Sequence, residues 1–209
     1  MTYDYSVYLV TDRTVMSAAT LGEAVEQAIL GGCTMVQLRE KEMSSADFYD
    51  SAKEIKQITD QYDIPLIVNN RVDIALAVDA AGVHVGQSDI PAYAARKIIG
   101  EKRLLGVSVS SVGEAVLALN DGADYLGVGA MFPTKTKKDA EIVSIPELCA
   151  IRRAVDIPLV VIGGINQTNA ARFRDLGVDG LAVVSAIIAQ PDIRRAASEL
   201  KRAFVERRR

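Results

Sequence analysis

Short apolar runs rich in β-branched residues alternate with longer stretches of helical periodicity along the whole chain. We expect strands at 7–10, 34–38, 66–69, 83–85, 104–109, 125–128, 159–162 and 180–184. We expect helices at 21–30, 45–62, 72–78, 92–99, 112–120, 145–155, 167–176 and 186–204. Strands that are apolar throughout are typical of parallel sheets covered on both faces, so the alternation predicts a series of βα units.

Eight such units in 209 residues leave roughly 26 residues per unit, which suits a compact (β/α)8 TIM barrel. We therefore expect one catalytic domain that spans residues 1–209. A doubly wound open sheet is the alternative. No Gly-x-Gly-x-x-Gly pattern follows the first expected strand, so the sequence does not support a dinucleotide site of that kind.

Composition narrows the class of partner. The net charge of −3 argues against a nucleic-acid surface, and no apolar run approaches the ~20 residues of a membrane helix. The first residues lack a basic region followed by an apolar one, so we expect no signal peptide. Two cysteines, Cys33 and Cys149, suggest no disulfide framework. These features predict a cytoplasmic protein with small-molecule partners, no nucleic acid and no membrane, and they leave room for a homo-oligomer.

The segment Gln37-Leu38-Arg39-Glu40-Lys41 closes the second expected strand. Alternate strand residues share a face, so Gln37, Arg39 and Lys41 should point the same way. Two cations at the end of a buried strand are costly unless an anion meets them, and an Arg beside a Lys suits a phosphate or pyrophosphate. The alternative is a solvated strand end in which the cations pair with Glu40 or Glu42.

In a barrel, the residues that follow the strands converge on one face, where active sites form. Polar residues gather at these positions after most of the expected strands. They are Arg39 and Lys41; Asn69, Asn70 and Arg71; Gln87, Ser88 and Asp89; Ser108 and Ser110; the segment 129–139; Gly163, Gly164 and Asn166; and Ser185.

Two of these groups predict anion sites. Backbone N–H groups at Gly163-Gly164 and at Val184-Ser185 can approach a phosphate where a helix begins. Gly163-Gly164 as a simple tight turn is the alternative. Arg39, Lys41 and Lys137 would form the second anion site, and two facing anion sites predict two phosphorylated substrates.

Asp89, with Asn69 and Asn70 one loop away, offers carboxylate and amide oxygens of the kind that Mg²⁺ prefers. The alternatives are a helix N-cap at Ser88 or Asp89 and turn positions for the asparagine pair. His84 is the only histidine, which excludes a multi-histidine zinc site and makes a Ser-His-Asp triad hard to build. We expect His84 to be a packed strand residue.

Taken together, seven segments resemble the thiamine-phosphate synthase family. They are Tyr8-Leu9-Val10-Thr11-Asp12, Gln37-Leu38-Arg39-Glu40-Lys41, Asn69-Asn70-Arg71-Val72-Asp73-Ile74-Ala75-Leu76, Gly82-Val83-His84-Val85-Gly86-Gln87-Ser88-Asp89, Pro133-Thr134-Lys135-Thr136-Lys137-Lys138, Ile162-Gly163-Gly164-Ile165 and Val183-Val184-Ser185-Ala186-Ile187. The resemblance implies a TIM-barrel transferase of thiamine biosynthesis that joins a hydroxymethylpyrimidine diphosphate to a thiazole phosphate, uses Mg²⁺ and releases pyrophosphate.

The resemblance also implies roles for individual residues. The residues implied to bind the pyrimidine diphosphate are Gln37, Arg39, Lys41, Asn69, Ser108 and Lys137. The residues implied to bind the thiazole phosphate are Thr134, Thr136, Gly164, Val184 and Ser185. Leu38, Glu40 and Lys135 belong to the same substrate-binding motifs, and Asn70 and Asp89 would stand at the metal. Arg39, Lys41, Ser108 and Lys137 would act in catalysis.

Residue 70 departs from the family pattern, because many members carry Asp where this chain has Asn70. An amide oxygen can still ligate Mg²⁺, with one negative charge fewer. The resemblance implies a dissociative reaction, in which pyrophosphate leaves before the thiazole nitrogen attacks and no protein nucleophile is needed. The alternatives on this fold are a thiazole tautomerase-like isomerase, which carries a catalytic His in the segment matching 106–110, and a non-catalytic phosphate-ligand sensor.

Overall fold

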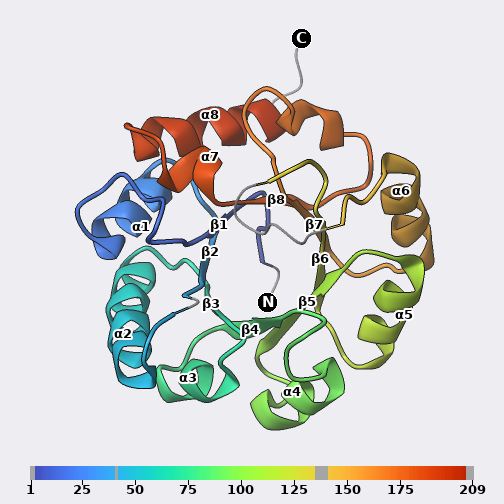
Figure 1. The fold of residues 1–209 in the computed structure, drawn as a ribbon, viewed down its shortest axis with the longest axis horizontal. Coiled ribbons are helices and arrows are strands. Elements are labelled where there is room, and N and C mark those ends of the chain that lie inside the picture. The colour runs from blue at the N-terminus through green and yellow to red at the C-terminus, as the bar shows by residue number, and fades with distance from the viewer. Residues whose placement is uncertain (1–2, 41, 135–140, 206–209) are drawn as a thin grey trace.

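The computed structural model describes residues 3–40, 42–134 and 141–205. Eight parallel strands pair in chain order around a closed barrel (Figure 1). They are β1 (Val7–Val10), β2 (Met35–Leu38), β3 (Leu66–Asn69), β4 (Gly82–Val85), β5 (Leu104–Val109), β6 (Tyr125–Gly129), β7 (Leu159–Ile162) and β8 (Gly180–Val183). The predicted (β/α)8 barrel is confirmed and the open sheet is wrong, because β1 pairs with β8, with Val7 opposite Leu181.

Helices cover the outside of the barrel (Figure 1). They are α1 (Leu21–Leu30), α2 (Ser45–Gln61), α3 (Val72–Ala77), α4 (Ala92–Ile99), α5 (Val112–Asn120), α6 (Ile145–Ala154), the 3-10 helix η1 (Ala170–Phe173), α7 (Ser185–Ile188) and α8 (Ile193–Val205). Among the described residues, no helix is both long enough and apolar enough to cross a membrane.

The α-helix expected at 167–176 is wrong, because only η1 forms there. The asparagines before it take local backbone groups. Asn166 Oδ1 accepts from Thr168 N at 2.9 Å, and Asn169 Oδ1 accepts from Asn166 N at 2.9 Å. Such side-chain bonds compete with helical ones and keep the segment in turns.

The single helix expected at 186–204 is split into α7 and α8. Pro191 lies at the break, where it lacks an N–H and would clash with the preceding turn of a continuous helix. Asp192 lies directly before α8 and caps its first turn, since its Oδ1 accepts from Arg195 N at 2.9 Å. The break leaves α7 as a short extra helix directly after β8.

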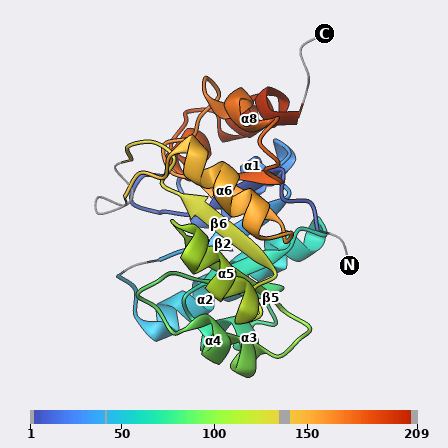
Figure 2. The ribbon, with the colours of Figure 1, turned by 90° about the vertical axis from the view of Figure 1, so that its right-hand side faces the viewer.

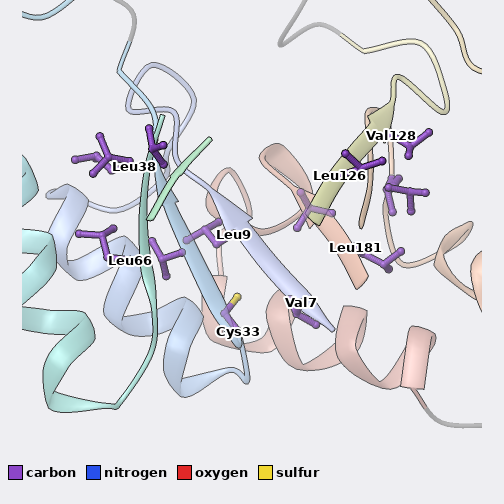
Figure 3. Close-up of a cluster of buried hydrophobic side chains, with 14 of the residues drawn as sticks. Val7, Leu9, Cys33, Leu38, Leu66, Leu126, Val128 and Leu181 are labelled. Atoms are coloured by element: carbon purple, nitrogen blue, oxygen red, sulfur yellow. The ribbon is translucent and has the colours of Figure 1, made fainter. Parts of the chain in front are cut away.

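Side chains alternate along each strand between the barrel interior and a layer under the helices. Figure 3 shows part of the outer layer, which includes Leu9, Leu38, Leu66 and Val128. The apolar and aromatic side chains of the interior are Tyr8, Val10, Met35, Ile67, Leu104, Tyr125, Val160 and Ala182. By the same alternation Gln37, Asn69, His84 and Ser108 point into the interior.

The segment before β1 lies at the N-terminal end of the barrel, opposite the loops that follow the strands (Figure 2). Tyr3, Asp4 and Tyr5 line a hollow there together with Leu104 and Asp124. Tyr5 is buried, and its ring lies 5.3 Å from that of Tyr125. The interior is therefore filled at this end by tyrosine side chains.

Gly106 on β5 makes room for two large side chains of the interior. It pairs with His84 on one neighbouring strand and with Tyr125 on the other. A Cβ at Gly106 would lie 2.1 Å from Tyr125 Cζ and 2.4 Å from His84 Nδ1. The missing side chain is thus what allows His84 and Tyr125 to meet across β5.

We predict that Gly106→Ala destabilises the protein by about 1–3 kcal/mol, the usual cost of overpacking a core. The matched control is Gly113→Ala in α5, where the nearest atom to a new Cβ, apart from its chain neighbours and the helix backbone, is Ser111 Oγ at 4.0 Å. A helical Gly→Ala change of this kind should stabilise by about 0.5–1 kcal/mol. Urea unfolding measures both, and equal stability of Gly106→Ala and wild type would contradict the packing role.

Candidate active site

Four polar side chains enter the barrel interior from β2, β3, β4 and β5. Asn69 pairs with His84 in the sheet, and its Nδ2 donates to the His84 carbonyl oxygen at 3.3 Å. Gln87, in the loop after β4, donates through Nε2 to the Ser108 carbonyl oxygen at 2.7 Å. Three of the predicted pyrimidine-diphosphate residues, Gln37, Asn69 and Ser108, are therefore held on rigid strands that share one interior.

A continuous chain of side-chain hydrogen bonds crosses this interior. Gln37 Nε2 donates to Tyr8 Oη at 2.8 Å, and the Tyr8 and Tyr125 hydroxyls are hydrogen-bonded at 2.8 Å. His84 lies next, with Nδ1 3.0 Å from Tyr125 Oη and Nε2 2.9 Å from Ser108 Oγ. His84 is packed within its strand as predicted, and the chain joins two predicted site residues, Gln37 and Ser108.

Burial sets the protonation of the two tyrosines in this chain. Removal from water raises the pKa of the Tyr8 hydroxyl, an effect only partly offset by its hydrogen bonds to Tyr125 and Gln37. Burial likewise raises the pKa of Tyr125 well above its ordinary value. Both phenols are therefore neutral at physiological pH.

The end of β2 carries the predicted cation Arg39 and the carboxylate Glu40. The Arg39 backbone N–H donates to Thr11 Oγ1 at 2.9 Å. Glu40 pairs with Arg13, whose Nε donates to Glu40 Oε2 at 2.9 Å. Within the described part of the chain, the Arg39 guanidinium forms no salt bridge with Glu40 or Glu42, so the alternative is not borne out for Arg39; for Lys41 it lies outside the described residues.

Glu40 itself is a buried carboxylate. Its side chain is 6% exposed, and Oε1 has no hydrogen-bond partner among the residues that the structure describes. Burial raises the pKa of Glu40, and the Arg13 guanidinium opposes this only in part.

Asn70 and Asp89 follow the adjacent strands β3 and β4. Asn70 takes a left-handed conformation with φ of 65°, and its N–H donates to the His84 carbonyl oxygen at 2.8 Å, so it is a turn residue. Asp89 Oδ2 accepts from Gly86 N at 2.8 Å. Because α4 begins at Ala92 without a side-chain cap, the N-cap alternative for Ser88 or Asp89 is wrong.

The donor set at these two loops is one carboxylate and one amide. In the described ranges, no group of three or more His, Cys, Asp or Glu side chains could hold a metal ion. Carboxylate and amide oxygens fit Mg²⁺, which usually takes one or two protein ligands together with substrate phosphates and water. The chemistry of Asn70 and Asp89 thus suits a metal that arrives with a diphosphate.

Gly163 and Gly164 follow β7 with φ of 97° and 64°. A Cβ at Gly164 would lie 2.7 Å from Phe132 Cβ, and one at Gly163 would lie 2.5 Å from Ala130 Cβ. Phe132 N donates to the Gly163 carbonyl oxygen at 3.1 Å. The glycines therefore form a tight turn that also lets the segment after β6 lie against it.

Ser185 is the first residue of α7, directly after Val184. The loops after β7 and β8 are joined, because Gln167 Nε2 donates to the Ala186 carbonyl oxygen at 3.2 Å. Loops seven and eight together with a short extra helix form the common phosphate site of TIM barrels. Gly164, Val184 and Ser185 occupy that arrangement.

The remaining predicted residues fall into two groups. Leu38 is fully buried in the outer layer, so only its backbone could contact a ligand. Thr134 is the last described residue before the gap. Lys41, Lys135, Thr136 and Lys137 lie outside the described residues.

Sequence reasoning missed Tyr8 and Tyr125 as members of the site. A signal was present, because a tyrosine inside an apolar strand buries a hydroxyl that needs a partner. The identity of that partner was hidden, since Tyr8 and Tyr125 are 117 residues apart in the chain.

Known proteins resemble this chain over nearly its whole length. The family model for thiamine monophosphate synthase matches residues 7–187. A thiamine-phosphate synthase of Clostridium beijerinckii is 64% identical over 203 residues, which cover 97% of each chain. One of Clostridium botulinum is 60% identical over 201 residues, covering 96% of this chain and 94% of the relative.

Solved structures agree. A thiamine phosphate pyrophosphorylase from Pyrococcus furiosus superimposes with a TM-score of 0.89 at 40% identity, covering 97% of this chain and 96% of the other. A 3-hexulose-6-phosphate synthase superimposes with a TM-score of 0.68 at 16% identity, covering 95% of this chain and 100% of the other, which shows the shared fold alone.

We predict that Glu40→Gln is stabilising relative to wild type, and more so at pH 7 than at pH 4. The raised pKa of Glu40 means that the native state binds its proton more tightly than the unfolded state, so wild-type stability falls as pH rises through this window. The glutamine carries no buried charge, and the Arg13 side chain is 39% exposed, so leaving it unpaired costs little.

Urea unfolding at the two pH values measures this difference. Glu101→Gln, which changes an exposed carboxylate, is the control and should show no comparable pH dependence. A stability gain for Glu40→Gln that is the same at both pH values, or larger at pH 4, would contradict the prediction.

Proposed function

The chain belongs to the thiamine monophosphate synthase family, and we propose that it condenses 4-amino-2-methyl-5-(diphosphooxymethyl)pyrimidine with 4-methyl-5-(2-phosphoethyl)thiazole, giving thiamine phosphate and pyrophosphate. The observation that supports the proposal is the convergence of Gln37, Asn69 and Ser108 on strands of one closed barrel, whose β7 and β8 are followed by loops that suit a phosphate.

We propose that the pyrimidine diphosphate binds at the β2–β5 side of the barrel. Gln37, Asn69 and Ser108 supply neutral polar groups from the strands, and Arg39 supplies a guanidinium that can grip two phosphate oxygens. The motif adds Lys41 and Lys137, which lie outside the described residues. Leu38 and Glu40 belong to the same proposed binding segment, and Leu38 could contact the substrate only through its backbone groups.

The thiazole phosphate is proposed to bind on the other side of the barrel. Backbone N–H groups at Gly164 and at Val184-Ser185 suit its phosphate. Thr134, at the edge of the described segment, is proposed to contribute its hydroxyl. The motif places Lys135 and Thr136 next to it in sequence.

Asn70 and Asp89 would hold Mg²⁺, as their oxygen donors allow. Bound Mg²⁺ would supply positive charge to the diphosphate oxygens of the substrate. Asp89 Oδ2 accepts from Gly86 N, which leaves Oδ1 as the oxygen without a hydrogen bond to the described residues. The left-handed backbone at Asn70 turns this residue out of β3 at the rim of the barrel.

The residue inventory suits a dissociative reaction. Such a reaction needs fixed charge at the leaving group and exclusion of water, and it needs no protein nucleophile. Arg39, Lys41 and Lys137 would stabilise the departing pyrophosphate. Both ring nitrogens of His84, the only histidine, already have hydrogen-bond partners, which fits a reaction without a general base.

The curated relatives named thiamine-phosphate synthase favour this function over a thiazole tautomerase-like isomerase. The segment 106–110 also lacks a histidine.

A non-catalytic sensor of phosphate ligands is distinguished from the enzyme by an activity assay. Purified protein incubated with both substrates and Mg²⁺ should form thiamine phosphate and pyrophosphate in equal amounts, and formation of neither would overturn the proposal.

We also propose a cytoplasmic location, supported by the free cysteines Cys33 and Cys149. Association into a homo-oligomer stays a prediction, for which gel filtration with light scattering is the direct measurement.

Arg39→Ala is expected to lower turnover roughly 10²–10³-fold, the usual loss for a group that stabilises charge in the transition state. Its melting temperature should change little, because the Arg39 guanidinium has no ion-pair partner among the described residues. Arg195→Ala, on the exposed face of α8, is the control for removal of an arginine. Near wild-type turnover of Arg39→Ala at saturating substrate would show that this residue does not act on the leaving group.

Asn70→Asp is expected to lower the Mg²⁺ concentration that gives half-maximal rate, because a carboxylate adds a negative charge within reach of the ion. Asp tolerates the left-handed backbone of this position, so the fold should be preserved. Asn120→Asp, at the end of α5, controls for the charge change. Superimposable magnesium titrations of Asn70→Asp and wild type would mean that residue 70 does not sense the metal.

A further inference from the structure

Tyr8, Tyr125 and His84 lie between two proposed substrate-binding residues and have no role of their own in the proposed reaction. Their exposed fractions are 1%, 0% and 7%, so their polar atoms are satisfied inside the barrel. They connect Gln37 on β2 to Ser108 on β5 through four consecutive hydrogen bonds of 2.8 to 3.0 Å.

The direction of these bonds follows from giving every hydroxyl hydrogen a partner. The Gln37 amide nitrogen can only donate, so Tyr8 Oη accepts from it. Either hydroxyl could donate in the Tyr8–Tyr125 bond. If Tyr125 donated to Tyr8, the Tyr8 hydrogen would have no partner among the described residues, so Tyr8 donates to Tyr125 and Tyr125 donates to His84 Nδ1. Because Nδ1 accepts, the imidazole hydrogen stands on Nε2, where it is donated to Ser108 Oγ.

We propose that Tyr8, Tyr125 and His84 are positioning residues that fix the direction of the Ser108 hydroxyl, so that Ser108 accepts from His84 Nε2–H and donates its own hydrogen to the diphosphate substrate. This inference rests on the proposed function. It assigns Ser108 the role of a preset hydrogen-bond donor to the oxygens of the diphosphate.

Three features of the interior support a fixed direction. Both tyrosines are neutral, so each has one hydrogen to give and neither can act as a phenolate that only accepts. Gly106 leaves the space that the His84–Tyr125 contact needs. Gln87 fixes the Ser108 backbone through its carbonyl oxygen. A donor that is aimed before the substrate binds does not have to reorient during the reaction.

The first test reads the tautomer of His84 directly. Because this is the only histidine, a long-range ¹⁵N–¹H spectrum of uniformly labelled protein gives one imidazole pattern without assignment by mutation. We expect a neutral ring protonated at Nε2. A ring protonated at Nδ1, neutral or cationic, would overturn the inference, and this measurement does not depend on the enzyme being active.

The second test breaks the chain in its middle. Tyr125→Phe should release His84 Nδ1 from its donor, mix the two tautomers and lower kcat roughly five- to tenfold, as expected for loss of one hydrogen bond. Tyr5→Phe is the matched control. It removes a hydroxyl from the neighbouring ring, 5.3 Å away, that bonds to none of the described side chains.

The third test asks whether Tyr125 acts through Ser108. In a double-mutant cycle, Tyr125→Phe should lower kcat in the wild-type background and have no further effect in Ser108→Ala. Equal fold losses in both backgrounds would overturn the inference, because they would show a general packing effect. If the protein makes no thiamine phosphate, the proposed function fails. The tautomer of His84 still decides the direction of the hydrogen bonds between Gln37 and Ser108.

Discussion

Closure of the sheet between β1 and β8 is the constraint on which the other features depend. A closed parallel barrel has no free edge, and it brings the carboxyl ends of all eight strands to one rim. Alternation along each strand then divides side chains between the interior and the layer under the helices. Gln37, Asn69 and Ser108 face a common interior only because this geometry is fixed by closure.

A polar interior would be unstable without full satisfaction of its hydrogen-bonding groups, because each buried unpaired group costs about 1–3 kcal/mol. The bonds from Gln37 to Ser108 meet that need, and they also tie five strands together. Glycine is required for this arrangement, since any side chain at Gly106 would occupy the space between His84 and Tyr125. Stability and the shape of the site are therefore set by the same contacts.

Much of the fold could be predicted from sequence, because β-branched apolar runs and Gly or Pro punctuation mark strands and turns locally. The α-helix expected at 167–176 was wrong because side-chain hydrogen bonds override the helical periodicity, as those of Asn166 and Asn169 do before η1. The break at Pro191 was readable from the sequence and was missed. The Tyr8–Tyr125 bond was not readable, since it depends on which strands face each other across the barrel.

The two proposed substrate sides of the barrel differ in construction, and the difference matches their chemistry. In the proposed reaction the bond that breaks belongs to the diphosphate, and its developing charge must meet donors already in place, a role that side chains on rigid strands would suit. The thiazole phosphate needs only to be anchored, which backbone N–H groups after β7 and β8 can do. Side-chain positions are therefore fixed most tightly on the side of the barrel where charge would develop. The hydrogen bonds from Gln37 to Ser108 would fix the directions of the side-chain donors there as well.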